Sequence, residues 1–194
     1  MKKKKPLELP SIEELEAEIT RQKKKQNQHS LLRNALYTLI VVAAVTALVA
    51  VLFMPVLKTY GTSMSPTLQE GEIVVAVKTG EAKPGDVIAF KYNNRIFIKR
   101  VIASGGAVVD IDEAGNVSVD GTVLDEPYVS EKTLGNGDVE FPLTVPEGQY
   151  FVLGDNRVNS GDSRSSVFGT VEPEDMLGKV LICVWPLNRF GAVH

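Results

Sequence analysis

Ser63 lies in a short loop sequence whose residue types could fix a serine hydroxyl in one conformation, as a nucleophile requires. Residues Gly61–Pro66 read GTSMSP, in which the glycine permits a tight backbone and the proline fixes one φ angle. A serine hydroxyl becomes a nucleophile only when a neighbouring group accepts its proton. Turns rich in Gly, Ser, Thr and Pro are common, so this loop taken alone is better explained as a plain turn.

The candidates for that proton acceptor are few, because the sequence holds only two histidines. His29 precedes a long uncharged stretch, and His194 is the last residue, at a terminus of the kind that tends to fray. A Ser-His-Asp triad is therefore not expected. No cluster of histidines and carboxylates suggests a metal site, so neither a metal nor another cofactor is expected. The remaining candidate bases are carboxylates and lysines.

The single cysteine, Cys183, excludes an internal disulfide and a CxxC metal or redox site. It lies within the apolar run VLICV of residues 180–184, a pattern typical of a buried and inert thiol. We therefore expect no catalytic role for it.

Lys99 has a different setting from the other lysines of residues 58–194, which mostly lie among turn or polar residues. It belongs to the run RIFIKRVI of residues 95–102, where strand alternation places it on one face with Phe97 and Val101. Burial on an apolar face lowers the pKa of a lysine, and a neutral lysine can accept a proton from a serine. A lysine that reaches water from an edge strand explains the spacing equally well.

A third candidate is the polar segment Gly154–Arg164, which reads GDNRVNSGDSR and follows the apolar strand pattern of residues 150–153. Asp162 and Arg164 are spaced to form a charge-assisted pair that fixes the loop. Ser160 is placed to hydrogen bond with a neighbouring side chain. The alternative is a solvated polar loop.

The element that anchors these residues is an uncharged stretch of 23 residues, 35–57. As a helix it measures about 34 Å at about 1.5 Å per residue, which matches the roughly 30 Å hydrocarbon core of a bilayer. A buried core helix fits less well because the stretch has no polar face. A cleaved signal fits less well because such apolar regions are shorter and lie closer to the N-terminus.

The charges around this stretch predict its orientation. Residues 1–34 hold nine Lys and Arg against five Asp and Glu, whereas residues 58–194 hold twelve against nineteen. Basic residues mark the cytoplasmic flank. We therefore expect a basic cytoplasmic tail (1–34), a transmembrane helix (35–57) and an extracytoplasmic domain (58–194). The acidic outer part argues against nucleic acid as a partner.

Within the tail, the SIEE pattern at residues 11–14 predicts the start of a helix that reaches about Lys25. Lys23–Lys25 suit contact with anionic membrane lipid, although a solvated charged face explains them better.

The outer part, residues 58–194, is predicted to be mostly β, because short runs rich in Val, Ile and Phe are separated by turn residues. The expected strands are Glu72–Val77, Asp86–Lys91, Arg95–Val101, Ala107–Asp112, Asn116–Val119, Thr122–Leu124, Gln149–Leu153 and Lys179–Val184.

Four stretches, in chain order, resemble the sequence boxes of the bacterial type I signal peptidases. They are Ser63–Thr67 (SMSPT), Gly85–Phe90 (GDVIAF), Ile98–Val101 (IKRV) and Gly154–Arg164. The resemblance covers roughly residues 35–185. The short chain with one span is more similar to members from Gram-positive bacteria than to the longer form with two spans.

The resemblance implies a Ser-Lys dyad, in which Ser63 attacks the scissile carbonyl and neutral Lys99 accepts its proton. Ser160 would orient Lys99, and Asp162, Arg164 and Asp155 would support the loop. The implied fold is an antiparallel β-sheet domain behind one membrane helix. The implied substrates are secretory preproteins with small residues at positions −1 and −3 of the cleavage site. Four residues are expected in the substrate pocket: Tyr60, Met64, Phe97 and Ile98.

One departure concerns the oxyanion hole. The resemblance implies that the Ser63 backbone N–H donates to the oxyanion, and some members carry a hydroxyl side chain two residues before the nucleophile. Here that position is Gly61, so the second donor to the oxyanion is left open.

Two other classes of function remain: a membrane-anchored β domain that binds without catalysis, and a self-cleaving Ser-Lys regulator. The second would need a DNA-binding module, for which residues 1–34 are too short.

Overall fold

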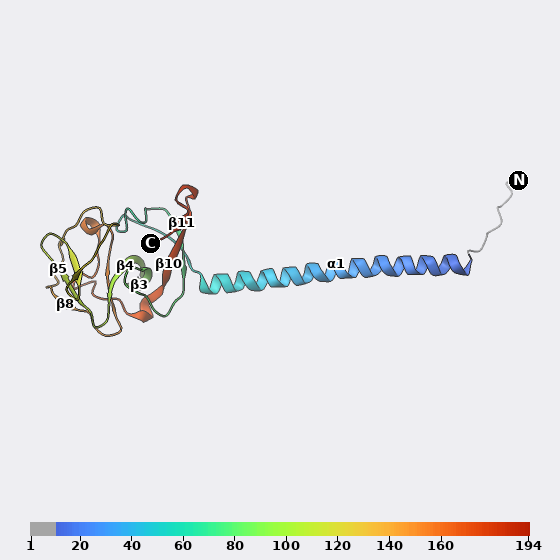
Figure 1. Ribbon diagram of the computed structural model, residues 1–194, viewed down its shortest axis with the longest axis horizontal. Helices are drawn as coiled ribbons and strands as arrows, with labels where there is room; N and C mark the ends of the chain where they lie inside the picture. The colour runs from blue at the N-terminus through green and yellow to red at the C-terminus, as the bar shows by residue number, and fades with distance from the viewer. Residues whose placement is uncertain (1–10) are drawn as a thin grey trace. The chain divides into compact units, whose positions relative to one another are not determined.

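The computed structural model of the protein describes residues 11–194, which form a long helix and a β-rich unit (Figure 1). The chain divides into two compact units, of which the first ends at Ala50 and the second runs from Val51 to His194. The first is helical from Ile12 onward, and the second contains the strands of the described residues.

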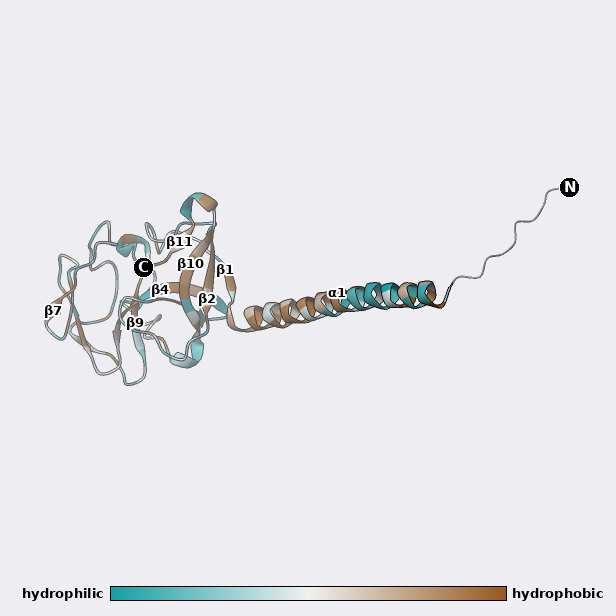
Figure 2. Cartoon of the chain, turned by 45° about the vertical axis from the view of Figure 1, so that its right-hand side comes forward, coloured by the Kyte–Doolittle hydropathy of each residue, from teal (hydrophilic) through white to brown (hydrophobic). Residues whose placement is uncertain are grey.

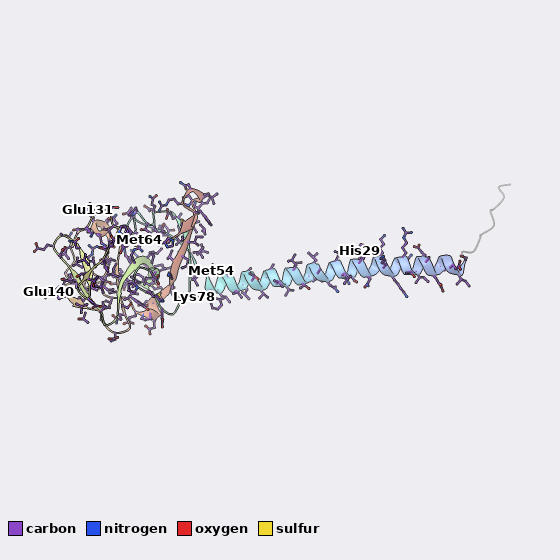
Figure 3. The ribbon with its side chains drawn as sticks, in the orientation of Figure 1. His29, Met54, Met64, Lys78, Glu131 and Glu140 are labelled. Atoms are coloured by element: carbon purple, nitrogen blue, oxygen red, sulfur yellow. The ribbon has the colours of Figure 1, made fainter. Side chains whose placement is uncertain are left out.

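The helix α1 runs without interruption from Ile12 to Phe53, so the helix predicted from Ser11 does not end near Lys25. Figure 2 shows hydrophilic residues along its N-terminal part and hydrophobic residues toward its C-terminal end. The side chains of its most apolar part are exposed, and its length and composition fit one membrane span. His29 lies on this helix (Figure 3).

The helix ends four residues before the uncharged stretch does. Pro55 follows at the second position beyond Phe53, and a proline disfavours helical backbone at the residue before it. Residues Val56–Lys58 instead form the strand β1. The end of the predicted 35–57 segment therefore belongs to the β unit.

The β unit contains two antiparallel sheets, which confirms the mostly β fold expected from the sequence. The larger sheet has the order β1-β2-β10-β3-β4-β9, with β11 paired to β10, and the smaller has the order β7-β6-β5-β8. The strands are β1 (Val56–Lys58), β2 (Ile73–Val77), β3 (Val87–Tyr92), β4 (Arg95–Ser104), β5 (Val108–Ile111), β6 (Val117–Val119), β7 (Thr122–Val123), β8 (Leu143–Thr144), β9 (Tyr150–Leu153), β10 (Met176–Trp185) and β11 (Gly191–Ala192).

All eight predicted strands are present, with shifted ends. The sequence missed β1, which lies at the end of the uncharged stretch that was assigned to the membrane helix, and also β8 and β11, which have two residues each. Strand β4 is the element that matters most for the site. Its residues 99–103 are all buried, since apolar clusters cover both faces of the sheet there. Figure 3 also shows the buried Met64 within this unit and the exposed Glu131 and Glu140 on its outer part.

Candidate active site

Ser63 lies in the loop that joins β1 to β2, and two buried side chains hold this loop against the core. Met64 and Leu68 are 5% and 2% exposed and belong to the apolar cluster beneath the sheet. At the base of the loop, Thr59 N–H donates to the Glu72 carbonyl at 2.8 Å. Gly61 has a φ of +75°, a backbone conformation that favours glycine at this bend. The half-buried Ser63 therefore sits on a fixed support.

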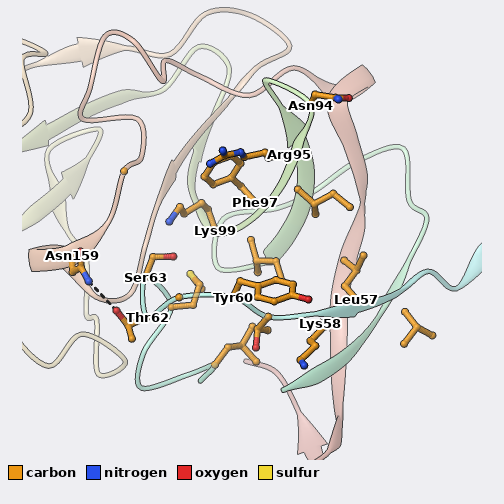
Figure 4. Close-up of a pocket in the computed structure, with 18 residues that line it drawn as sticks. Leu57, Lys58, Tyr60, Thr62, Ser63, Asn94, Arg95, Phe97, Lys99 and Asn159 are labelled. Atoms are coloured by element: carbon orange, nitrogen blue, oxygen red, sulfur yellow. Dashed lines mark hydrogen bonds between the residues drawn. The ribbon is translucent and has the colours of Figure 1, made fainter. Parts of the chain in front are cut away.

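The polar segment after β9 also holds the Ser63 loop. The Asn156 backbone N–H donates to the Ser63 carbonyl at 3.0 Å, and its side chain donates to the Thr62 carbonyl at 3.2 Å. Asn159 Nδ2 donates to Thr62 Oγ1 at 2.9 Å, which is the bond dashed in Figure 4. Sequence reasoning assigned no role to Asn156 or Asn159, because their place in a polar loop did not reveal a partner so distant in the chain.

Lys99 is 1% exposed in β4, and its Nζ donates to Ser160 Oγ at 2.9 Å. Burial is the main effect on this amine and lowers its pKa to about 8; Asp162 acts in the opposite direction, the Arg164 charge lowers the pKa further, and Asp155 raises it. Figure 4 shows the Lys99 amine and the Ser63 hydroxyl pointing toward the same part of the pocket. Within residues 11–194 no hydrogen bond joins the two side chains.

Asp162 and Arg164 form the charge-assisted pair that their spacing predicts. Arg164 Nε donates to Asp162 Oδ1 at 2.8 Å and Arg164 Nη2 to Asp162 Oδ2 at 3.0 Å. Asp162 Oδ2 also accepts from the Gly154 N–H at 3.1 Å, and Arg164 Nη2 donates to the Arg157 carbonyl at 2.8 Å. The pair therefore closes the loop that carries Ser160.

Asp155 binds a different partner, Arg100, the neighbour of Lys99 in β4. Arg100 donates to the two Asp155 oxygens at 2.8 and 2.7 Å, and Thr67 Oγ1 donates to Asp155 Oδ2 at 2.5 Å. Thr67 belongs to the loop that carries Ser63. Asp155 thus links the Ser63 loop, the strand of Lys99 and the Ser160 loop.

Two further ion pairs support the site and were missed from the sequence. Arg157 Nη2 donates to Glu126 Oε1 at 2.5 Å with both side chains buried, and Arg189 pairs with the buried Glu72. Arg189 Nη2 also donates to the Thr67 carbonyl at 2.9 Å. Each pair joins distant parts of the chain, and no local spacing signals it.

A pocket of about 960 Å³ opens beside Ser63 and Lys99. All four residues expected in a substrate pocket line it, although Met64 is buried in the core and Tyr60 is 78% exposed. The full lining is Val56, Leu57, Lys58, Thr59, Tyr60, Gly61, Thr62, Ser63, Met64, Leu68, Asn94, Arg95, Ile96, Phe97, Ile98, Lys99, Asn159 and Gly161.

Two strand edges border this pocket. In the described part of the chain, residues 11–194, strand β1 pairs only with β2. The first half of β4, residues 95–99, pairs there only with β3, since β9 begins its pairing at Arg100. Each edge therefore offers backbone groups to an extended peptide.

Among residues 11–194, the Ser63 N–H donates to no acceptor, so it remains available to donate a hydrogen bond beside the Ser63 hydroxyl. No group of three or more His, Cys, Asp or Glu residues in the same range could hold a metal ion.

Comparison with known proteins gives consistent matches. The model of the family described as signal peptidase, peptidase S26, matches residues 31–185. A signal peptidase I of Bacillus licheniformis is 37% identical over 77% of this chain and 87% of its own length. A signal peptidase IB of Staphylococcus aureus (strain COL) is 36% identical over 67% of this chain and 77% of its own length. The crystal structure of a signal peptidase I from Enterococcus faecalis V583 aligns with a TM-score of 0.42 and 33% identity, over 51% of this chain and 96% of that one.

Proposed function

The chain belongs to the peptidase S26 family of signal peptidases, and on that premise we propose that Ser63 and Lys99 are the catalytic dyad with which it removes signal peptides. As a signal peptidase it is a hydrolase that acts on secretory preproteins. The observation that carries the proposal is the buried Lys99, whose pKa is lowered to about 8 and whose amine points with Ser63 into one pocket.

The proposed reaction has two stages. Ser63 Oγ attacks the carbonyl carbon of the residue at −1 while neutral Lys99 accepts the hydroxyl proton. The Ser63 N–H donates to the oxyanion. When the scissile C–N bond breaks, Lys99 passes its proton to the leaving amine. Lys99 then takes a proton from a water molecule that attacks the acyl-enzyme ester, and it returns that proton to Ser63 Oγ as the ester bond breaks.

The supporting residues keep Lys99 in position for these transfers. Ser160 accepts a hydrogen bond from Lys99 at 2.9 Å, which limits the amine to a narrow range of orientations. Asp162 and Arg164 fix the loop of Ser160, and Asp155 joins that loop to Arg100. We propose that Asp155, Asp162 and Arg164 position the dyad, because each contacts the loops around it.

The substrate is proposed to lie extended between β1 and the first half of β4. The two free strand edges described above supply backbone partners for such a peptide. Tyr60, Met64, Phe97 and Ile98 are proposed to form the walls that accept small side chains at −1 and −3. Their apolar surfaces line the pocket next to Ser63.

Replacing Ser63 with alanine is expected to reduce cleavage of a preprotein by about 1000-fold or more, as loss of a nucleophile does in other serine hydrolases. The measurement is cleavage of one preprotein by the detergent-solubilised full-length protein. Ser65→Ala, in the same loop, is the matched control and should keep most of the activity. A non-catalytic binding domain predicts no loss, so equal rates for wild type and Ser63→Ala would reject the dyad.

We propose that the membrane segment of α1 is a single span with its N-terminus in the cytoplasm, in contact with membrane lipid. The nine Lys and Arg residues before it support this orientation. A protease added outside right-side-out vesicles should then digest the β unit and spare the tail, as read by antibodies to each end. Digestion of the tail alone would show the opposite orientation.

A further inference from the structure

The segment between β7 and β8, residues 124–142, contacts the three buried arginines that support the site. These arginines are Arg100, Arg157 and Arg164. In the same order, their partners in the segment are the Tyr128 ring, the Glu126 carboxylate, and the backbone carbonyls of Thr133 and Leu134. Each arginine also has a partner in the polar segment after β9, so residues 124–142 meet the site at three separate points.

Tyr128 covers one face of the Arg100 guanidinium. The Arg100 Cζ atom lies 3.9 Å from the centroid of the Tyr128 ring, a position in which the ring attracts the cation. Arg100 follows Lys99 directly in β4, and it donates to both Asp155 oxygens. The ring therefore confines a side chain whose backbone is continuous with that of the proposed base.

The hydroxyl of Tyr128 extends this contact to a second arginine. It donates to Glu126 Oε1 at 3.1 Å, and Glu126 accepts from Arg157 Nη2 at 2.5 Å and from Arg157 Nη1 at 3.3 Å. Burial raises the pKa of the Tyr128 hydroxyl, and the Glu126 charge raises it further, so the hydroxyl stays a donor. Arg157 Nε in turn donates to the Gly154 carbonyl at 3.1 Å.

Gly154 is the residue at which this chain of contacts meets the site. It packs against the Ser160 side chain and the Ser63 carbonyl so closely that a Cβ there would overlap both. Ser160 also accepts the hydrogen bond from Lys99. A shift of Arg157, and of the Gly154 carbonyl that it binds, is therefore transmitted to the nucleophile loop and to the support of the proposed base.

We propose that Tyr128 and Glu126 are positioning residues for the dyad. By joining Arg100 to Arg157, they hold the strand of Lys99 in a fixed position relative to the loops that carry the nucleophile and the lysine support. This inference rests on the proposed function. It assigns to the smaller sheet, whose connection carries both residues, a part in catalysis that the pocket lining does not reveal.

The alternative is that residues 124–142 only stabilise the fold. Among the described residues that line the pocket, neither Tyr128 nor Glu126 is present, so neither is expected to contact the substrate. A positioning role therefore predicts a lower kcat with little change in KM. A purely stabilising role predicts a lower unfolding temperature, with the kcat of the folded enzyme unchanged.

The test measures kcat and KM for one preprotein with the full-length protein in neutral detergent, at a temperature where circular dichroism shows each variant to be folded. Tyr128→Leu removes the ring from Arg100, and Glu126→Asp shortens the carboxylate without leaving Arg157 unpaired. Each should lower kcat about 10-fold, which is less than the roughly 100-fold effect of misplacing reacting groups by about 1 Å, because both arginines keep their other partners. The KM should stay within about 2-fold of wild type. Tyr128→Phe keeps the ring and should retain about a third or more of the kcat.

Phe141→Leu is the matched control, because it removes an aromatic ring from the same segment at a different contact. Phe141 packs on Phe151, with the ring centroids 6.1 Å apart, in the apolar cluster that includes β5. This change should lower the unfolding temperature about as much as Tyr128→Leu does. Its kcat should equal that of wild type.

Ser63→Ala in the same assay separates this inference from the proposed function. If Ser63→Ala cleaves the preprotein as fast as wild type, the proposed function is wrong and this inference falls with it. If Ser63→Ala is inactive but the folded Tyr128→Leu and Glu126→Asp proteins keep the wild-type kcat, only the positioning role is rejected. An equal loss of kcat in Phe141→Leu, a raised KM with unchanged kcat, or failure of both variants to fold would also reject it.

Discussion

Lys99→Arg is expected to lower kcat/KM for preprotein cleavage by about 1000-fold or more, within the range for loss of a general base. Lys99 acts in the proposed reaction by accepting a proton, and a guanidinium does not lose its proton in the working pH range. Lys99→Met tests the same step without a buried charge and should be equally inactive while remaining folded. Lys91→Arg, on the exposed part of β3, is the matched control and should retain wild-type activity. High activity in Lys99→Arg would show that Lys99 is a structural residue.

The pH dependence of kcat/KM is expected to follow the titration of the Lys99 amine. Burial lowers the pKa of Lys99 to about 8, from a reference value of 10.5, so the neutral form predominates above about pH 8. The wild-type kcat/KM should therefore rise tenfold per pH unit below about pH 8 and level off above it. A rate that is constant between pH 6 and 9, or that rises only near pH 10.5, would contradict the assignment of Lys99 as the base.

The sequence predicted the setting of Lys99 for a reason that was only partly correct. Alternation placed Lys99 on an apolar face of a strand, with the opposite face left undetermined. In the structure both faces of β4 are covered there, and Arg100 is as deeply buried as Lys99. Arg100 is tolerated because Asp155 accepts two hydrogen bonds from it, and burying a charge is costly unless it is paired. That pairing depends on a contact 55 residues apart, which alternation does not reveal.

The local pairs and the distant pairs of the site differ in how well they could be predicted. Asp162 and Arg164 are two residues apart, so their pairing was readable from spacing. Arg157 and Glu126 are 31 residues apart, and Glu126 lies in a segment with no motif of its own. The fold class was readable because hydrophobic runs and turn residues alternate along the chain. The contacts between loops depend on how the sheets pack, and periodicity carries no information about them.

Gly154 lies in close contact with both the Ser63 loop and Ser160, and the sequence shows no sign of this beyond its place in the polar segment. A Cβ added there would lie 2.2 Å from Ser160 Oγ and 2.5 Å from the Ser63 carbonyl oxygen. Both atoms belong to groups proposed to act at the dyad: Ser160 holds Lys99, and the Ser63 carbonyl accepts from Asn156. A methyl group would therefore move the nucleophile loop and the lysine support away from each other.

Gly154→Ala is accordingly expected to reduce kcat by about 100-fold or more, because a displacement of about 1 Å at reacting groups has an effect of this size. The KM should change much less, since the strand edges that border the pocket are not displaced. Gly80→Ala is the matched control, because a Cβ at that position meets no atom within 4 Å. Thermal unfolding of both variants, read by circular dichroism, separates a misplaced dyad from a failure to fold. A folded Gly154→Ala protein with wild-type kcat would show that the close approach of Gly154, Ser63 and Ser160 does not set the geometry of catalysis.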